Sequence, residues 1–441
     1  MNSMINKDDP PPLPLDHRDP IVAIQFELKR LRRSSVRLRR ALLGLSAAFL
    51  ALAVIVAAIA GLQGTKISSL DDRQGLISNP NVAFASRTGR KNLNGLTYGG
   101  SLFRGSGFWA MKPRLPYNLA DHAAIGVDPD ELIFIIGGSL VDGNVTSDVW
   151  KYDTVFRNYT KVAPMPEPRY RFGAALLDKK IYVVGGRNSS SPENIALVKS
   201  TLIYDIAKNE WSRGTDQIDF HGDTCAASVN GKIYVAGGYG FDYNFLNSVE
   251  VYDPAKNQWS KVPNMPTPRG DLMCVSFMNE LYVLGGYYDP TNKGGNAFLA
   301  AMESFNPTTG QWTKRPDMLT PRGDAAALVL PGNKLMIVGG EGHYREKDIF
   351  KYPKHVNEVF YGDDQTWVQK AMIPTPRFRT AGAVAGGVAF VFGGADVCIA
   401  VDICPVQNTT ETFLDVDHPR VYLYLKNEAY NDNSESTTYP V

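Results

Sequence analysis

A pair of adjacent glycines recurs six times in this chain of 441 residues, each time directly after a short apolar run. Successive pairs lie about 50 residues apart. The apolar runs are too short for helices and stop at glycine, as buried β-strands do. The pairs are Gly137-Gly138, Gly185-Gly186, Gly237-Gly238, Gly285-Gly286, Gly339-Gly340 and Gly393-Gly394. This period predicts an all-β architecture built from six copies of one unit.

A second signature follows each of the first five glycine pairs, in which two aromatic residues stand seven positions apart. Asp, Asn, Pro and Gly residues between them favour a hairpin turn, so the two aromatics are expected on adjacent strands, packed between neighbouring units. The aromatic pairs are Tyr152 and Tyr159, Tyr204 and Trp211, Tyr252 and Trp259, Phe305 and Trp312, and Phe360 and Trp367. Four Pro-Arg elements come next, at Pro168-Arg169, Pro268-Arg269, Pro321-Arg322 and Pro376-Arg377.

Together these elements closely resemble the kelch-repeat family over residues 107 to about 425. The resemblance implies an all-β fold, a six-bladed kelch-type β-propeller. Tyr159 stands where the family usually has Trp, and the sixth repeat has no Trp. Trp109, however, precedes the first glycine pair. We therefore expect residues near 107–112 to supply the outer strand of the last blade, which closes the ring and removes its exposed edges.

The N-terminal region is predicted to anchor the chain in a lipid bilayer. Residues 41–62 carry no charge and are long enough, as a helix, to cross a hydrocarbon core of about 30 Å. Seven Lys and Arg residues crowd positions 29–40 before this segment, whereas few follow it. This asymmetry predicts a single-pass type II orientation, with residues 1–40 cytosolic and the propeller extracellular or lumenal. A cleaved signal peptide is the alternative.

The remaining segments complete the predicted organisation. Residues 1–40 are Pro-rich and then basic, residues 63–106 form a stalk, and residues 426–441 form a disordered C-terminal tail. The stalk holds a basic tetrapeptide, 87–90, of the kind that proteases cleave. Plasma membrane and Golgi or other secretory membranes remain alternative locations.

The function classes are narrowed by charge and by missing motifs. The 46 Lys and Arg residues balance 45 Asp and Glu residues, which disfavours a nucleic-acid partner. The sequence lacks HExxH, a nucleophile elbow and a phosphate loop. We therefore expect a non-catalytic module without a cofactor or metal that binds a protein or glycan. The alternative is a secretory-pathway enzyme or enzyme scaffold, such as a galactose-oxidase-like propeller, because kelch propellers include radical copper oxidases.

Cysteines and glycosylation sequons add expectations about the lumenal side. Cys225 and Cys274 are expected to be buried free thiols on inner strands, whereas Cys398 and Cys404 share one loop and are expected to form a disulfide. Four acceptor sequons, all in predicted loops or turns, begin at Asn144, Asn158, Asn188 and Asn408.

Alignment of the repeats on their glycine pairs predicts a ring of charge where the inner strands begin. Its members are Asp121, Arg171, Asp223, Asp271, Asp324 and Arg379. The family resemblance implies that arginines at the places of Arg171 and Arg379 bind acidic peptides, but the four aspartates weigh against a purely acidic ligand. The alternative is a set of Arg–Asp pairs that tie blades together. Two Arg-Gly-Asp triplets, 269–271 and 322–324, are interpreted as fold residues because they occupy equivalent repeat positions.

A ligand site is predicted on the same face, over the third to fifth blades. The loops there are aromatic and free of sequons, whereas Asn144, Asn188 and Asn408 lie over the first, second and sixth blades. Flat aromatic rings bury area at little entropic cost, which suits peptides or sugars. The predicted binding residues are His221, Asp223, Asp271, Asp324, Arg171, Arg379, Tyr243 and Tyr288.

Overall fold

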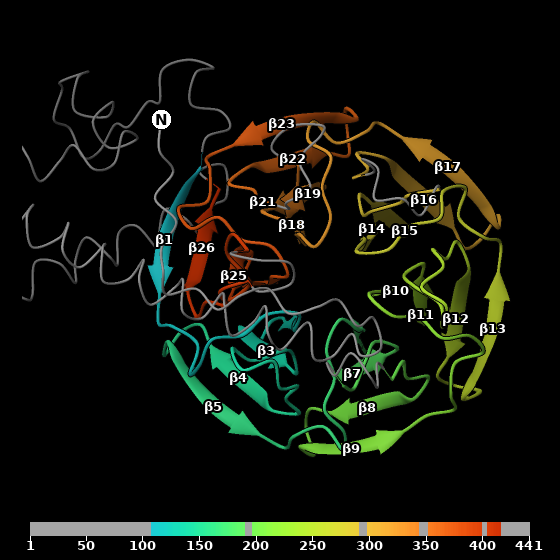
Figure 1. The fold of residues 1–441 in the computed structure, drawn as a ribbon, viewed down its shortest axis with the longest axis horizontal. Helices are drawn as coiled ribbons and strands as arrows, with labels where there is room; N and C mark the ends of the chain where they lie inside the picture. The colour runs from blue at the N-terminus through green and yellow to red at the C-terminus, as the bar shows by residue number, and fades with distance from the viewer. Residues whose placement is uncertain (1–106, 190–195, 291–297, 344–351, 399–403, 416–441) are drawn as a thin grey trace, which may run out of the picture. The chain divides into compact units, whose positions relative to one another are not determined.

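The computed structural model describes residues 107–189, 196–290, 298–343, 352–398 and 404–415. Within these residues, six four-stranded antiparallel sheets surround a central axis (Figure 1). The predicted all-β six-bladed propeller is therefore confirmed. The part of the chain described here has no helix long and apolar enough to cross a membrane. The predicted transmembrane segment, cytosolic tail, stalk and C-terminal tail lie outside the described residues.

Five blades are each a single stretch of chain whose strands follow one another from the channel outwards. Blade 1 holds β2 (Ala123–Val127), β3 (Leu132–Ile136), β4 (Val149–Asp153) and β5 (Asn158–Val162). Blade 2 holds β6 (Gly173–Leu177), β7 (Lys180–Val184), β8 (Thr201–Asp205) and β9 (Glu210–Arg213). Blade 3 holds β10 (Cys225–Val229), β11 (Lys232–Ala236), β12 (Val249–Asp253) and β13 (Gln258–Val262). Blade 4 holds β14 (Met273–Phe277), β15 (Glu280–Leu284), β16 (Met302–Asn306) and β17 (Gln311–Arg315). Blade 5 holds β18 (Ala326–Leu330), β19 (Lys334–Val338), β22 (Asn357–Tyr361) and β23 (Thr366–Lys370), with the short pair β20 (Glu341–Gly342) and β21 (Tyr352–Pro353) in its loop.

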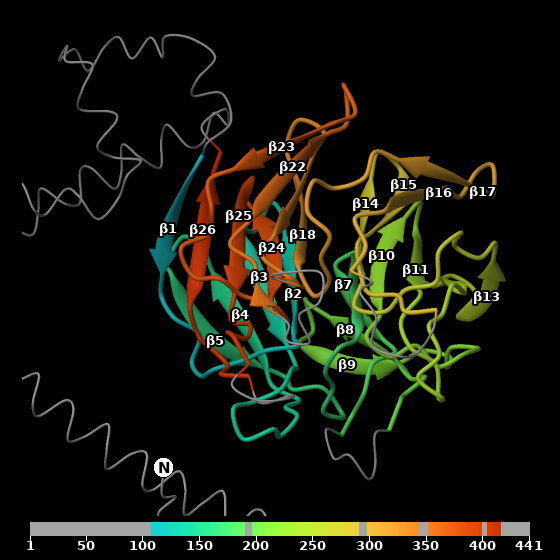
Figure 2. The same ribbon diagram turned by 45° about the horizontal axis from the view of Figure 1, so that its top comes forward.

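The sixth blade joins the two ends of the domain. Its inner strands are β24 (Ala381–Ala385), β25 (Val388–Phe392) and β26 (Thr410–Leu414). The outer strand is β1 (Phe108–Lys112), which pairs antiparallel with β26 and places Trp109 opposite Phe413. Figures 1 and 2 show these two strands side by side. The predicted ring closure by residues near 107–112 is confirmed.

The aromatic pairs seven residues apart join neighbouring blades, as predicted. In each hairpin the two aromatics face each other across the third and outer strands, as Tyr252 and Trp259 do with ring centroids 5.1 Å apart. The indole N–H then reaches a backbone carbonyl of the preceding blade, for example from Trp312 to Pro263 O at 2.8 Å. Tyr159 makes the equivalent contact through its hydroxyl, 3.0 Å from Pro113 O. Its departure from the family pattern therefore keeps the inter-blade hydrogen bond.

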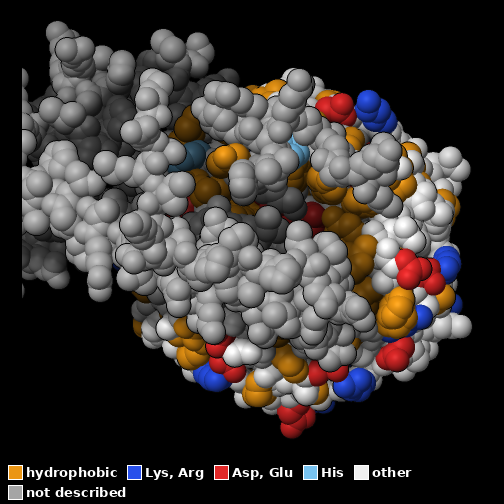
Figure 3. Space-filling view, in the orientation of Figure 1, with side chains coloured by type: hydrophobic (Ala, Val, Ile, Leu, Met, Phe, Trp, Pro, Cys, Tyr) orange, Lys and Arg blue, Asp and Glu red, His pale blue; other side chains and the backbone are white. Residues whose placement is uncertain are grey.

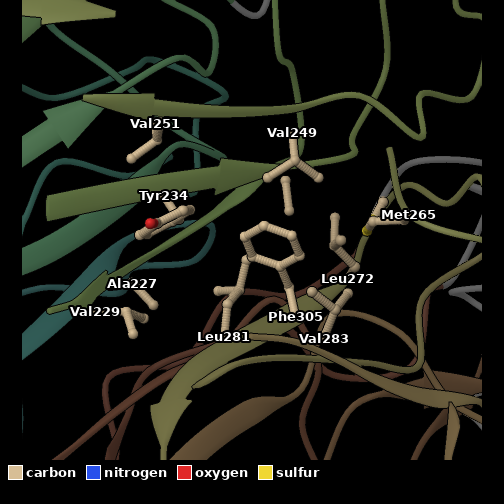
Figure 4. Close-up of a cluster of buried hydrophobic side chains, with 11 residues drawn as sticks. Ala227, Val229, Tyr234, Val249, Val251, Met265, Leu272, Leu281, Val283 and Phe305 are labelled. Carbon is tan, nitrogen blue, oxygen red and sulfur yellow. The ribbon is translucent and has the colours of Figure 1, made fainter. Parts of the chain in front are cut away.

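The core lies between blades rather than at one centre. The second strands are almost fully buried, and side chains from adjacent blades interdigitate around them. Figure 4 shows one such cluster, in which Phe305 of blade 4 packs near Val249 and Met265 of the preceding repeat. Gly238 illustrates why glycine is required: its φ is +90°, and an added Cβ would lie 2.2 Å from Gly222 O.

The arginines of the Pro-Arg elements are structural. Arg169, Arg269, Arg322 and Arg377 are completely buried. Three of them pair with a glutamate on the third strand of their own blade, as Arg269 does with Glu303 at 2.8 Å. Arg269 also donates to Gly285 O and Ala301 O at 3.0 Å. Because Arg269 and Arg322 begin the two Arg-Gly-Asp triplets and are fully buried, these two arginines are fold residues, as interpreted from the sequence.

The structure pairs all four cysteines in disulfides, including the two that were expected to be free thiols. Cys225 on β10 and Cys274 on β14 form a disulfide between blades 3 and 4, so the expectation of free thiols was wrong. The inner strands of adjacent blades converge on the axis, which brings the Cα atoms of these two residues to 5.6 Å. Cys398 and Cys404 form the disulfide expected in the last blade. All four cysteines of the chain are therefore oxidised.

Candidate functional site

The six residues of the predicted charge ring come together at the mouth of the central channel. Each has a left-handed backbone, with φ between 50° and 57°. In five places around the ring the backbone N–H of one member donates to the carbonyl of the member in the preceding blade, for example from Asp324 to Asp271 O at 2.9 Å. The ring lines a cavity of about 520 Å³. Its side chains are thus held by the fold at the edge of an open cavity.

Two ring arginines neutralise one side of this mouth. Arg171 Nε lies 3.0 Å from Asp121, and Arg171 Nη1 lies 3.4 Å from Asp223. Arg379 lies 3.8 Å from both Asp121 and Asp324. Burial opposes ionisation of Asp121, but the two guanidiniums prevail and hold the pKa of its carboxyl below the usual value. The Arg–Asp pairs expected between blades therefore exist, and they involve the ring arginines rather than those of the Pro-Arg elements.

The opposite side of the mouth is acidic. Asp271, in blade 4, forms no ion pair within the described residues, and its side chain is 5% exposed. Its Oδ2 accepts a hydrogen bond from the Tyr239 hydroxyl at 2.9 Å, whereas its Oδ1 has no hydrogen-bond partner among the described atoms. Burial, together with the nearby carboxylates of Asp271 and Glu341, raises the pKa of Asp324 well above its usual value. The carboxyl groups of Asp271, Asp324 and Glu341 therefore stand close together on this side.

A second tier of residues stands beside the ring, one directly after each glycine pair. Each bridges to the residue that precedes a ring member, as Tyr239 does to Gly222. Several also contact the ring through their side chains: Arg187 lies 2.7 Å from Asp223, and the Ser139 hydroxyl lies 3.0 Å from Asp121. The tier consists of Ser139, Arg187, Tyr239, Tyr287, Glu341 and Ala395. The sequence interpretation missed Arg187 and Glu341, although their place after the glycine pairs was a usable signal.

The aromatic loops of blades 3 to 5 form a continuous row next to the acidic side. Ring centroids lie 5.1 Å apart for Tyr239 and Phe245, 5.8 Å for Phe245 and Tyr287, and 5.3 Å for Tyr287 and Phe298. The row continues to His343 at 5.0 Å. Figure 3 views this face and shows acidic side chains beside the central hollow.

The individually predicted loop aromatics lie at the edge of this row. The Tyr243 side chain is 50% exposed, and the guanidinium of Arg187 stacks over its ring at 5.1 Å. Phe241 is 74% exposed. Tyr288 is half-buried and packs against Phe245 at 5.4 Å. Tyr243 is therefore available to a ligand, while Tyr288 supports the row from one side.

The prediction that His221 lines the channel mouth was wrong. It is fully buried, with Nδ1 2.7 Å from Gly237 O and Nε2 3.5 Å from Glu250. It occupies the position that arginine holds in the Pro-Arg elements of other blades, and like those arginines it faces its own blade. Asp223, Asp271, Asp324, Arg171 and Arg379 do line the cavity.

The sequons occupy different surroundings. Asn144 is exposed in the loop of blade 1, and Asn158 is exposed as the first residue of strand β5 rather than in a turn. Asn188 and Asn408 are half-buried, and Asn408 O accepts a hydrogen bond from the Leu115 backbone at 2.9 Å. No group of three or more His, Cys, Asp or Glu side chains in the described part of the chain is arranged to hold a metal ion.

Comparison with known proteins shows that the chain is a kelch-repeat propeller. It belongs to the Attractin/LZTR1 beta-propeller family, whose model matches residues 133–403. Human Kelch-like protein 25 is 33% identical over 215 residues, which cover 47% of this chain and 35% of that protein. The chain thus spans about a third of the length of this relative.

Two further similarities extend over more of the chain. Kelch-like protein terF from Aspergillus terreus is 27% identical over 317 residues, or 69% of this chain and 68% of that protein. The solved structure of YjhT superposes with a TM-score of 0.57 at 17% identity, covering 68% of this chain and 96% of that one. This structural likeness concerns the fold alone.

Proposed function

We propose that this chain is a non-catalytic binding module that engages a protein partner with the loop face of blades 3 to 5. The observation that carries the proposal is the continuous aromatic row beside the acidic side of the channel mouth. The rings of this row are half-buried, and Phe241 and Tyr243 at its edge are exposed. Aromatics next to charged groups supply both contact area and orientation in recognition surfaces. Because propellers host many activities, the proposal depends on this site and not on the fold. A glycan is the second ligand class that such a surface suits.

The enzyme alternative is weakened by the cysteines. A galactose-oxidase-like site needs a tyrosine cross-linked to a cysteine thiol. Cys225 and Cys274 are bonded to each other, as are Cys398 and Cys404, so neither pair offers a thiol for that cross-link. This supports a binding module over a radical copper oxidase.

We further propose that the propeller is displayed outside the cell or in the secretory lumen by a type II anchor at residues 41–62. The charge asymmetry around that segment supports this orientation. The two disulfides support it independently, because disulfides persist in oxidising compartments and are rare in the cytosol.

The binding proposal is tested on arrays of peptides from secreted proteins and of glycans, overlaid with the full-length chain in lipid nanodiscs. For any array member that binds, Tyr243→Ala and Tyr288→Ala should weaken binding about tenfold, the usual scale for a truncated aromatic contact residue. The matched controls are Val141→Ala and Val397→Ala, exposed apolar residues on the loops of blades 1 and 6. Binding that survives both tyrosine changes but is abolished by the controls would place the site elsewhere.

A further inference from the structure

We propose that the acidic side of the channel mouth receives a cationic side chain of the partner protein, a lysine ammonium or an arginine guanidinium, whose N–H groups donate to Asp271 Oδ1. The inference rests on the proposed function, since it states the chemistry that the loop face recognises.

Asp271 is the centre of this inference because its carboxylate is buried yet incompletely satisfied. Its side chain is 5% exposed, and Oδ1 has no hydrogen-bond partner among the described atoms. A buried acceptor without a donor is destabilising, and more so when it is charged. Oδ2 is held by the Tyr239 hydroxyl at 2.9 Å, which fixes the carboxylate at the edge of the cavity. A donor entering the channel mouth would complete its hydrogen bonding.

The surrounding charges favour a cationic donor over a neutral one. Arg171 pairs with Asp121 and Asp223, and Arg379 lies near Asp121 and Asp324, but neither arginine forms an ion pair with Asp271 among the described residues. Beside Asp271 stands Asp324, which is close enough to Asp271 and Glu341 for both carboxylates to disfavour its ionisation. Carboxylates packed this closely repel one another unless a cation enters or a proton binds. A lysine or arginine side chain would relieve that repulsion.

The walls of the site favour an organic cation over a metal ion. The aromatic row begins at Tyr239, whose hydroxyl contacts Asp271, and continues through Phe245 and Tyr287. Aromatic faces attract ammonium and guanidinium groups. Within the described residues the carboxylates do not converge into a metal-binding group. The cavity of about 520 Å³ is large enough to admit a lysine or arginine side chain. A partner would therefore dock on the loops and insert a single basic residue.

The test uses the full-length chain in nanodiscs and four capped pentapeptides that differ only at the central position of a glycine frame: lysine, arginine, glutamine or glutamate. Saturation-transfer NMR reports contact and gives a Kd by titration. The lysine and arginine peptides should bind at least about tenfold more tightly than the glutamine peptide, the factor expected for one charge-assisted hydrogen bond. The glutamate peptide should show no saturation transfer.

The decisive variant is Asp271→Asn, which should raise the Kd of both basic peptides about tenfold or more. The matched control is Asp242→Asn, which removes the same charge from an exposed position in the loop of blade 3 and should leave the Kd unchanged. Tyr239→Phe serves as a second variant should Asp271→Asn fold poorly, because it frees the Asp271 carboxylate without altering its charge and should weaken binding severalfold.

The inference is overturned if the glutamine peptide binds as well as the lysine peptide, if neither basic peptide binds the wild-type chain, or if Asp271→Asn binds like wild type. Its failure is distinct from failure of the proposed function. An array ligand whose binding depends on Tyr243 but not on Asp271 would support the proposed binding module and contradict only the insertion of a basic side chain at Asp271.

Discussion

Ring closure by β1 makes a quantitative prediction about Trp109. Its indole packs on Phe413 of β26 at 5.3 Å between ring centroids. Its Nε1 donates to Ala371 O, in blade 5, at 2.9 Å. The change Trp109→Ala therefore removes a contact within the sixth blade and a hydrogen bond to the fifth. Because β1 comes from the start of the domain, this loss weakens the junction between its two ends.

The magnitude follows from these contacts. Truncating a buried tryptophan to alanine costs about 3–5 kcal/mol, and the partial exposure of Trp109 places its contact loss at about 2–3 kcal/mol. The lost hydrogen bond to Ala371 adds about 1 kcal/mol. Unfolding entropy is about 2.1 cal/mol/K per residue, so a loss near 3.5 kcal/mol lowers the Tm of a domain of roughly 300 residues by about 6 °C.

Differential scanning fluorimetry of the full-length chain measures this shift. The control is Met111→Ala, on the same strand, whose side chain is 52% exposed. That change should cost no more than about 0.5 kcal/mol and move the Tm by less than about 1 °C. If Trp109→Ala melts within about 1 °C of the Met111→Ala control, the closing strand does not contribute the stability derived from its contacts.

Two further predictions concern location and charge. At least two sequons should carry N-glycan, chiefly the exposed Asn144 and Asn158. Endoglycosidase should therefore increase the gel mobility of the protein expressed in animal cells, and the increase should be smaller after both asparagines are changed to Gln. Unchanged mobility of the wild-type protein contradicts lumenal exposure. Burial and the carboxylates of Asp271 and Glu341 raise the pKa of Asp324. The folded chain therefore retains a proton that the unfolded chain loses above about pH 4. As a result, the folded state is progressively destabilised as the pH rises from about 4 towards the raised pKa. The Tm of Asp324→Asn relative to wild type should therefore increase between about pH 4 and pH 8, and a constant or shrinking difference contradicts the assignment.

The fold was predictable because its requirements are local and repeat six times. Glycine pairs mark close backbone approach, as Gly238 shows, and aromatic spacing marks a hairpin whose outer ring reaches the neighbouring blade. Even the closing strand followed from the sequence, because Trp109 and Pro113 precede Asp121 much as Trp312 and Pro316 precede Asp324. Such features need no knowledge of distant contacts, since each copy of the repeat confirms the others.

The site was predictable only in part. Alignment identified the ring members, but not which arginine reaches which aspartate, because that depends on side-chain direction across a channel. His221 was assigned to the mouth although the arginines aligned with it are buried against their own blades. The Cys225–Cys274 disulfide was missed because it depends on how adjacent inner strands converge at the axis, which no local pattern encodes.

The backbone conformation of the ring positions bears on which charged residues they hold. All six positions require a left-handed conformation, which aspartate adopts more readily than arginine does. The four aspartates thus suit the backbone, whereas Arg171 and Arg379 occupy it against local preference. Both arginines flank Asp121 and also approach Asp223 and Asp324, which leaves Asp271 as the one ring aspartate with no ion pair among the described residues. Blade-joining ion pairs therefore involve three of the four ring aspartates. Asp271 is left for a basic side chain to use.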